Sequence, residues 1–518
     1  MEVLNSFMTW IFKSRLGQID KFKQDPHEVQ KAMLFDLLEA AKHTQLGKAH
    51  HFGEIKSYAD FAARVPLFDY ESFTPYLEKT IKGKQHIFWH STIQWFAKSS
   101  GTTAGRSKYI PVSEESLEEC HYKGGKDMVS LYVNNYPDTK LFTGKSLSVG
   151  GTLEKEPLHP KGTARAGDVS ALIMHNLPIW VQFVRTPSLE TALMADWEAK
   201  IERMARETMD ENVTSIAGVP TWTLVLLQRI LELKKASHIL EVWPNLEVFF
   251  HGAVAFGPYR NLFKQLIPSD KMRYMETYNA SEGFFGMQDQ PDSDELLLLL
   301  DYGIFYEFIP TEELGKENPT VVSLEGVELG KNYALVITTN GGLWRYMIGD
   351  TIKFTSLHPY RFRVSGRTKH FINAFGEEVI VENAEAAITH ACAQTGATIV
   401  NFTAAPIYFE DSQSKGAHEW VVEFKNAPED LEDFAQKLDD HLREVNSDYD
   451  AKRHKDLALQ RLRLHAAPTG LFEAWLAKKG KLGGQHKVPR LSNSREFMDE
   501  ILALMATHSY RFLNPKTN

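Results

Sequence analysis

The segment SSGTTAGRSK, at 99–108, gathers the residue types that bind phosphate groups. Its glycines allow the backbone to turn tightly and to direct successive N–H groups toward one point. It lacks the Gly-Lys-Ser/Thr ending of a P-loop. We predict a polyphosphate-binding loop that follows a strand at 93–97, with a flexible surface loop as the alternative. The side chains that would donate hydrogen bonds or charge are Ser99, Ser100, Thr102, Thr103, Arg106 and Lys108.

A second segment, YNASEG, places Tyr278, Ser281 and Glu282 within five residues, after a strand expected at 271–276. An aromatic ring can stack on a purine, a hydroxyl can bind a phosphate oxygen, and a carboxylate can hold Mg²⁺. A turn capped by the serine is the alternative interpretation.

Two further segments add a carboxylate and a lysine. Asp350 follows a glycine in NGGLWRYMIGD, where we expect a strand to meet a turn, and it could accept both hydroxyls of a ribose. Lys487 lies in GQHKVPR near the C-terminus, on an expected loop that could carry it into a remote site. An ordinary turn aspartate and a solvated lysine are the alternatives.

Apolar spacing along the chain alternates between helical and strand patterns, which predicts an α/β architecture with a mixed sheet. We expect Gly47 to end the first of three amphipathic helices. The expected helices are 27–46, 188–208 and 220–240, and the expected strands are 140–149, 246–250, 296–308, 333–339 and 361–365.

A smaller α+β unit follows, and the segment between Gly366 and Gly376 could act as its hinge. We therefore predict a large domain at 1–370 and a small mobile domain at 371–518. Within the small domain the expected helices are 382–393, 428–446, 468–479 and 494–506, and the expected strands are 398–410, 418–425 and 459–466.

Composition limits the class of protein. A formal charge of -9 argues against a nucleic-acid partner, and 43% hydrophobic residues describe an ordinary folded chain. The two cysteines, Cys120 and Cys392, are not clustered, which excludes a disulfide framework and fits a reducing compartment. We find no signal peptide and no membrane span in the sequence, and we expect a cytoplasmic enzyme.

Taken in order, these segments resemble the adenylate-forming superfamily of acyl-CoA synthetases and luciferases. More closely, the chain resembles the acyl acid–amido synthetases, the auxin-responsive enzymes that conjugate plant hormones to amino acids, and their bacterial relatives. The resemblance runs from about residue 30 to about residue 506. Besides the segments above, its marks are FYEFIP at 305–310, YALVITTNGGLWRYMIGD at 333–350 and FRVSGR at 362–367.

The resemblance implies an ATP- and Mg²⁺-dependent ligase that adenylates a small carboxylic acid and transfers the acyl group to an amino acid. It places Tyr278 against adenine, Ser281 near the α-phosphate and Glu282 on Mg²⁺. Asp350 would take the ribose hydroxyls, Arg367 would approach the ribose or phosphate, and Lys487 would bridge the carboxylate and the α-phosphate. The residues implied to contact the ATP phosphates are Ser99, Ser100, Thr102 and Thr103.

The sequence also departs from the family pattern. The plant members carry a Ser-Asp-Lys run where this chain has Phe375 to Glu378, so that lysine contact is not carried over. Lys369 and His370 replace the usual acidic pair after Gly-Arg, which leaves the pivot residue open. An acyl-CoA ligase and a non-catalytic nucleotide-binding homologue remain alternatives. The acid, the amine, the general base and the oligomeric state stay open.

Overall fold

The computed structural model describes residues 15–513, apart from 104–105, 155, 161, 178, 369–370, 410–414 and 480–487. The side chains of 100–103, 106–107, 179–180 and 507–513 are also outside this description. The chain divides into two compact units. Unit 1 consists of Met1–Ser99, Lys108–Phe256 and Phe263–Thr368, and unit 2 consists of Ser100–Ser107, Gly257–Leu262 and Lys369–Asn518.

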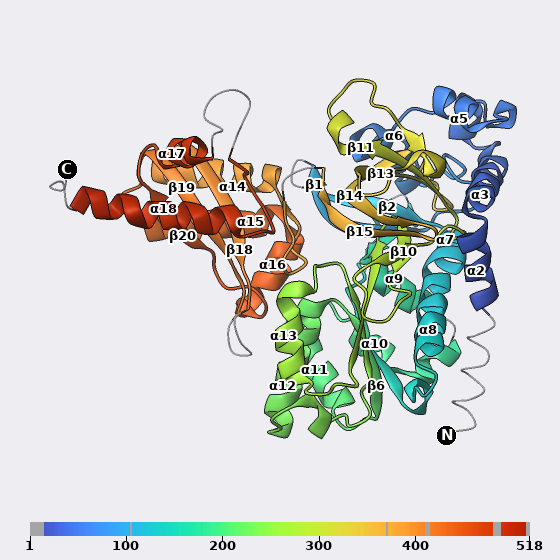
Figure 1. The fold of residues 1–518 in the computed structure, drawn as a ribbon, viewed down its shortest axis with the longest axis horizontal. Helices are drawn as coiled ribbons and strands as arrows, with labels where there is room; N and C mark the ends of the chain where they lie inside the picture. The colour runs from blue at the N-terminus through green and yellow to red at the C-terminus, as the bar shows by residue number, and fades with distance from the viewer. Residues whose placement is uncertain are drawn as a thin grey trace. The chain divides into compact units, whose positions relative to one another are not determined.

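Unit 1 is organised around a twelve-stranded mixed sheet, whose labelled strands in Figure 1 include β6, drawn in green, and β14 and β15, drawn in yellow to orange. The predicted α/β fold class, with a large mixed-sheet domain and a smaller α+β domain, is confirmed. In sheet order the strands are β12 (Val322–Ser323), β11 (Ile304–Pro310), β13 (Asn332–Thr339), β14 (Tyr346–Leu357), β15 (Tyr360–Arg367), β10 (Leu296–Leu298), β9 (Gly283–Met287), β8 (Arg273–Ala280), β7 (Val248–Gly252), β6 (Val213–Gly218), β3 (Lys145–Val149) and β5 (Arg185–Thr186).

The sheet has a parallel part and an antiparallel part that meet at β8. Strands β8, β7, β6, β3 and β5 run parallel to one another. From β8 to β9 and onward through β10, β15, β14, β13 and β11, the neighbours run antiparallel. The strands of the parallel part therefore all end at one edge, and β8 belongs to both parts.

Helices connect these strands and cover the sheet. Helices α11 and α12 pack together through Trp197 and Trp222, whose rings stack at 3.9 Å. The helices of this part are α2 (Leu16–Gln24), α3 (Pro26–Ala41), α4 (Gln45–Ala49), α5 (Tyr58–Arg64), α6 (Tyr70–Ile81), α7 (Glu114–Ser116), the π-helix η2 (Leu117–Tyr122), α8 (Lys123–Asn135), α9 (Val169–Asn176), α10 (Leu189–Ala192), α11 (Trp197–Thr208), α12 (Pro220–Lys234) and α13 (Gly257–Leu266).

Three predicted helices have wrong boundaries, and the one expected at 188–208 is two helices, α10 and α11. The helix expected at 27–46 ends at Ala41, and Gly47 lies inside α4 because the Thr44 hydroxyl caps a new helix by accepting the Gly47 N–H at 2.9 Å. A side chain at position 47 would clash with the Ala41 carbonyl oxygen at 2.2 Å. The helix expected at 220–240 ends at Lys234, since Lys235 takes a left-handed conformation with φ of 53°.

Two motif blocks meet in a buried ion pair inside unit 1. Glu307 of FYEFIP accepts two bonds from Arg345 of NGGLWRYMIGD, with Nε and Nη2 both 2.9 Å from carboxylate oxygens. The side chains are 1% and 5% exposed, and Arg345 also donates to the carbonyls of Ala62 and Val65. These residues tie α5 to the sheet, so part of the family pattern is architectural.

The three-stranded sheet has the order β2 (Arg106–Val112), β1 (Trp95–Thr103) and β4 (Arg165–Gly167). The predicted loop at 99–108 is therefore wrong for most of its length. Strand β1 continues through Thr103 and β2 begins at Arg106, because the two strands pair as neighbours in this sheet.

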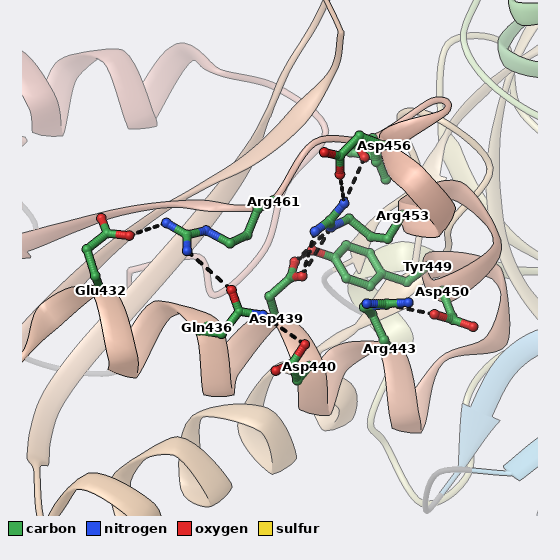
Figure 2. A network of polar contacts seen from close by, with 11 residues as sticks. Glu432, Gln436, Asp439, Asp440, Arg443, Tyr449, Asp450, Arg453, Asp456 and Arg461 are labelled. Carbon is green, nitrogen blue, oxygen red and sulfur yellow. Dashed lines mark hydrogen bonds and ion pairs between the residues drawn. The ribbon is translucent and has the colours of Figure 1, made fainter.

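Unit 2 contains the predicted α+β arrangement. Helices α15 and α16 are joined by a buried network in which Asp439 accepts bonds from Tyr449 at 2.6 Å and from Arg453 at 2.8 Å, as Figure 2 shows. The elements are β16 (Phe371–Ile372), β17 (Val379–Ile380), α14 (Val381–Thr395), β18 (Thr398–Ile407), β19 (Ala417–Asn426), α15 (Leu431–Val445), α16 (Ser447–Arg453), β20 (Arg463–Ala467), α17 (Leu471–Lys478) and α18 (Glu496–Leu513).

None of the helices in the described part of the chain combines the length and the apolar character that a bilayer crossing requires.

Candidate nucleotide site

The carboxyl ends of the parallel strands form one edge of the large sheet. Gly150 follows β3, Gly218 and Gly252 end β6 and β7, and Ser281 follows β8. A side chain at Gly252 would lie 2.4 Å from the Thr277 carbonyl oxygen, so that position requires glycine. In open α/β sheets this edge is where ligands bind.

The β8–β9 hairpin carries the YNASEG segment. The predicted strand at 271–276 is β8, and it continues through Tyr278 to Ala280. Ser281 and Glu282 form the turn that joins β8 to β9, and Ala280 pairs with Gly283. Glu282 therefore lies at the tip of a short hairpin, four residues after Tyr278 in the chain.

The surroundings of Glu282 disfavour its charged form. Burial raises the pKa of its carboxyl above the usual value, and the nearby Asp350 carboxylate acts in the same direction. The positive charges of Lys108 and Arg367 oppose this shift in pKa. A divalent cation bound here would stabilise the carboxylate more than these side chains do.

Asp350 is held by two other predicted residues. Its Oδ2 accepts a hydrogen bond from the Tyr278 hydroxyl at 2.5 Å, and its Oδ1 lies 2.8 Å from Arg367 Nε. Asp350 does not lie at a strand–turn junction as predicted but inside β14, because β14 pairs with β15 and places Asp350 opposite Arg367. Each carboxylate oxygen can accept a second bond, so the side chain can still take ribose hydroxyls.

The Tyr278 ring has a fixed position. It contacts Phe285 at 5.0 Å and Phe362 at 6.0 Å between ring centroids. Burial, followed by the Asp350 carboxylate, raises the pKa of the Tyr278 hydroxyl well above its usual value. The hydroxyl is therefore neutral and acts as a donor to Asp350.

The structure thus brings together Tyr278, Glu282, Asp350, Arg367 and Lys108, which come from four strands and one turn. The Lys108 ammonium also lies over the Tyr70 ring, 5.5 Å from its centroid. Ser281 is adjacent to Glu282 in the chain. Among the described contacts, none joins Ser99 to these residues.

Several predicted site residues fall outside the description. The side chains of Ser100, Thr102 and Thr103 are not described, and Lys487 lies within 480–487. The chain immediately after Lys487 is anchored to unit 2. The Pro489 carbonyl accepts the Thr403 hydroxyl at 2.6 Å, and the Arg490 carbonyl accepts the Ala404 N–H at 2.9 Å.

The described residues offer few protein ligands for the predicted Mg²⁺ ion. Within the described ranges no group of three or more His, Cys, Asp or Glu side chains could hold a metal ion. Magnesium is usually held by one or two carboxylates together with substrate phosphates. The half-buried carboxylate of Glu282 fits such a site.

The sequence did not indicate what surrounds the Gly150–Gly151 doublet. Added side chains would lie 2.2 Å from the Met174 methyl group and 2.0 Å from an Asp168 carboxylate oxygen. The buried Lys200 ammonium donates to both glycine carbonyls, at 2.7 and 2.8 Å. No motif around Lys200 signalled this contact.

Comparison with known proteins decides the family. The GH3 family N-terminal domain matches residues 15–272, the central domain matches 297–367 and the C-terminal domain matches 382–496. The chain belongs to the GH3 family. The resemblance predicted from the motifs is therefore confirmed.

The relatives of this GH3 protein include indole-3-acetic acid-amido synthetase GH3.3 of Arabidopsis thaliana, 23% identical, which covers 93% of this chain and 92% of the relative. The 4-substituted benzoates-glutamate ligase GH3.12 of Arabidopsis thaliana is 22% identical, and the match covers 84% of this chain and 87% of that relative. Among solved structures, the GH3.15 acyl acid amido synthetase matches with a TM-score of 0.60 at 18% identity, over 95% of each chain. A 2-hydroxyisobutyryl-CoA ligase matches with a TM-score of 0.56 at 14% identity, over 92% of each chain.

Proposed function

We propose that this GH3 protein is an ATP-dependent ligase that converts a small carboxylic acid to its acyl-adenylate and then transfers the acyl group to an amino acid. The products would be an amide, AMP and pyrophosphate. The convergence of Tyr278, Glu282, Asp350 and Arg367 in one unit supports the nucleotide part of this proposal. Relatives named as amido synthetases and as a glutamate ligase support the amide-forming part.

Asp350 would accept the ribose hydroxyls while Tyr278 and Arg367 hold its carboxylate in place. Because both partners are already bound, the carboxylate need not reorganise when the nucleotide enters. Adenine would lie against the Tyr278 ring. Arg367 and Lys108 would add positive charge beside the phosphates, with hydroxyls from Ser99, Ser100, Thr102, Thr103 and Ser281 as further donors.

Adenylation brings a carboxylate toward the α-phosphate, so two anions must approach each other. Mg²⁺, when bound, would neutralise part of this charge. Glu282 would hold the ion with its half-buried carboxylate. Lys487 would contribute a second positive charge to the reacting groups, and its position in the chain, next to an anchored segment of unit 2, is compatible with delivery by a loop.

Amine attack requires different groups from adenylation. We therefore propose that the small domain, which we predict at 371–518, changes position between the two half-reactions. The glycines at 366 and 376 both have positive φ, of 149° and 87°, so backbone rotation near them encounters little steric resistance.

An acyl-CoA ligase is the second candidate, and the fold shared with 2-hydroxyisobutyryl-CoA ligase keeps it open. We propose to incubate the purified protein with ATP, Mg²⁺ and a panel of aromatic, aliphatic and keto acids, and to measure pyrophosphate release. The active acid is then combined with amino acids or with coenzyme A, and the products are weighed by mass spectrometry. An amide supports the proposal, a thioester supports the second candidate, and no pyrophosphate with any acid contradicts both.

A further inference from the structure

Arg185 is a buried cation without an anionic partner. Its side chain belongs to β5, at the parallel end of the large sheet, and the residue is only 4% exposed. Its Nε and Nη1 atoms have no hydrogen-bond partner among the described residues. Its Nη2 atom donates to the Met174 sulfur at 3.0 Å, and a thioether is a weak acceptor.

Other buried arginines of this protein have strong partners. Arg345 binds Glu307 and Arg453 binds Asp439, each in a pair that is almost fully buried. Arg185 forms no ion pair with any carboxylate in the described part of the chain, and burial lowers the pKa of its guanidinium. A buried, unpaired charge opposes folding, and its presence points to a ligand that supplies the missing charge.

The guanidinium lies close to the ligand-binding edge of the sheet. Arg185 pairs with Ser146 near the amino end of β3, but its guanidinium contacts the Met174 side chain, which lies against Gly150 at the carboxyl end of that strand. Phe183 and Val184, the two residues before Arg185, are 77% and 48% exposed, so this part of the chain reaches the surface. The Nε and Nη1 atoms of Arg185 are themselves closed to solvent, so an anion reaches them only when the side chains around them move apart.

A second buried cation lies beside the same glycines. Lys200 is completely buried, binds the carbonyls of Gly150 and Gly151, and lies over the Trp197 ring at 4.4 Å. The nearest described anion that acts on it is Asp168, whose carboxylate accepts the Thr152 N–H at 2.6 Å. Lys200 thus fixes the glycine segment and adds positive charge to its surroundings.

We propose that Arg185 binds a substrate carboxylate that does not take part in the reaction. A planar guanidinium with free N–H groups matches a carboxylate in two parallel hydrogen bonds. The proposal rests on the proposed ligase function, and it adds a substrate class to it. The acid would carry a second anionic group at its far end.

The position of Arg185 favours the far end of the acid over the acceptor amino acid. Strand β5 is four steps from β8 in the sheet, which corresponds to about 19 Å at the usual spacing between strands. The arginine side chain reaches back toward β3 and shortens this distance. The α-carboxylate of an amino acid is only two bonds from its reacting amine, so it would remain near the phosphate site.

The test compares the wild-type protein, Arg185→Met and the control Arg203→Met, which removes an exposed arginine of α11. We expect α,ω-dicarboxylates from glutarate to suberate to raise the wild-type unfolding temperature more than sodium chloride of equal ionic strength. Arg185→Met should lose this shift and, without ligand, unfold at the wild-type temperature or higher. Arg203→Met should behave like the wild type. Equal dicarboxylate shifts in wild type and Arg185→Met, or a lower unfolding temperature of the ligand-free variant, would overturn the proposal.

Activity measurements identify which substrate, the acid or the amino acid, carries the carboxylate that Arg185 binds. We expect pyrophosphate release to have at least about a tenfold lower KM for a dicarboxylic acid than for its monomethyl ester, and we expect Arg185→Met to lose this preference. If the variant instead changes only the KM of the amino acid, the anion belongs to the acceptor and the assignment to the acid is wrong. Absence of pyrophosphate release with any acid would contradict the ligase function, while the thermal measurement would still decide whether Arg185 binds carboxylates.

Discussion

Asp350 and Arg367 face each other across strands β14 and β15, and their side chains meet with Arg367 Nε 2.8 Å from Asp350 Oδ1. The strand register, rather than a loop, therefore orients the carboxylate. Tyr278 fixes the second oxygen from a third strand. A carboxylate held in this way would lose little conformational freedom on binding the proposed nucleotide.

Asp350→Asn should raise the KM for ATP. A hydrogen bond to a charged group contributes about 1.5–3 kcal/mol, which corresponds to a rise of about tenfold or more. Steady-state pyrophosphate release at varied ATP measures the effect. Asp294→Asn is a matched control, because Asp294 also pairs with an arginine of β15, Arg363, but its side chain is 69% exposed. Similar KM values for the two variants would contradict the role of Asp350.

Glu282→Gln should increase the Mg²⁺ concentration needed for half-maximal activity by about tenfold or more, since one charged ligand is lost. The same variant should be more stable than the wild type at neutral pH without nucleotide. Burial raises the pKa of Glu282, so its charge destabilises the folded protein, and this cost disappears as the pH falls through the raised pKa. Magnesium titrations and thermal unfolding at several pH values test both effects. An unchanged Mg²⁺ requirement would exclude Glu282 as a metal ligand.

Lys487→Ala should slow adenylation by orders of magnitude, because a positive charge is lost where two anions meet. Amide formation from a supplied acyl-adenylate should remain close to the wild-type rate. Pyrophosphate release and single-turnover amide formation measure the two steps separately. Lys479→Ala serves as the control, since that lysine pairs with Glu500 on unit 2. Equal loss of both steps would be inconsistent with a role confined to adenylation.

Asp439→Asn should destabilise unit 2 by about 3 kcal/mol, because it leaves the buried Arg453 charge without its partner. Asp450→Asn removes the partner of Arg443 in the same network of Figure 2, but these side chains are 49% and 36% exposed. The control should cost less than about 1 kcal/mol. Hydrogen exchange of α15 and α16 reports the stability of this unit. The prediction is wrong if α15 and α16 show equal protection against hydrogen exchange in the two variants.

His121→Gln should reduce the acid sensitivity of unit 1. Burial lowers the pKa of His121 from 6.5 to about 4, so the unfolded chain takes up a proton before the folded chain does. The free energy of unfolding of the wild type should therefore fall by about 3 kcal/mol between pH 6.5 and about pH 4, and should not change through His121 above pH 6.5. Denaturant unfolding at pH 7.5 and pH 4 measures this loss. A variant with the wild-type pH dependence would show that His121 does not titrate in this way.

Local patterns predicted much of the fold and part of the site. The YNASEG segment indicated Tyr278 and Glu282 because their chemistry lies within five adjacent residues. Helix ends were less predictable at Gly47, where the hydroxyl of Thr44 begins a new helix. Whether a short Gly/Ser/Thr segment forms a loop or a strand depends on its neighbours in the sheet, which one sequence does not reveal.

Long-range contacts account for what the sequence could not predict. Asp350 and Arg367 were identified from separate motifs, but their pairing requires the register of two strands. Arg185 and Lys200 lie in no motif, and an unpaired buried cation is recognisable only when the packing around it is known. The family resemblance also could not separate binding residues from the structural pair of Glu307 and Arg345.

The meeting of parallel and antiparallel strands at β8 has an evolutionary consequence. The residues that we propose to bind the nucleotide lie on β8, β14 and β15, whereas Gly150, Arg185 and Lys200 belong to or border the parallel strands. Under these proposed assignments, mutations around β3 and β5 would change the acid that is accepted without disturbing adenosine recognition. With the sheet divided in this way, related proteins could evolve specificity for different acids while the activation reaction stays the same.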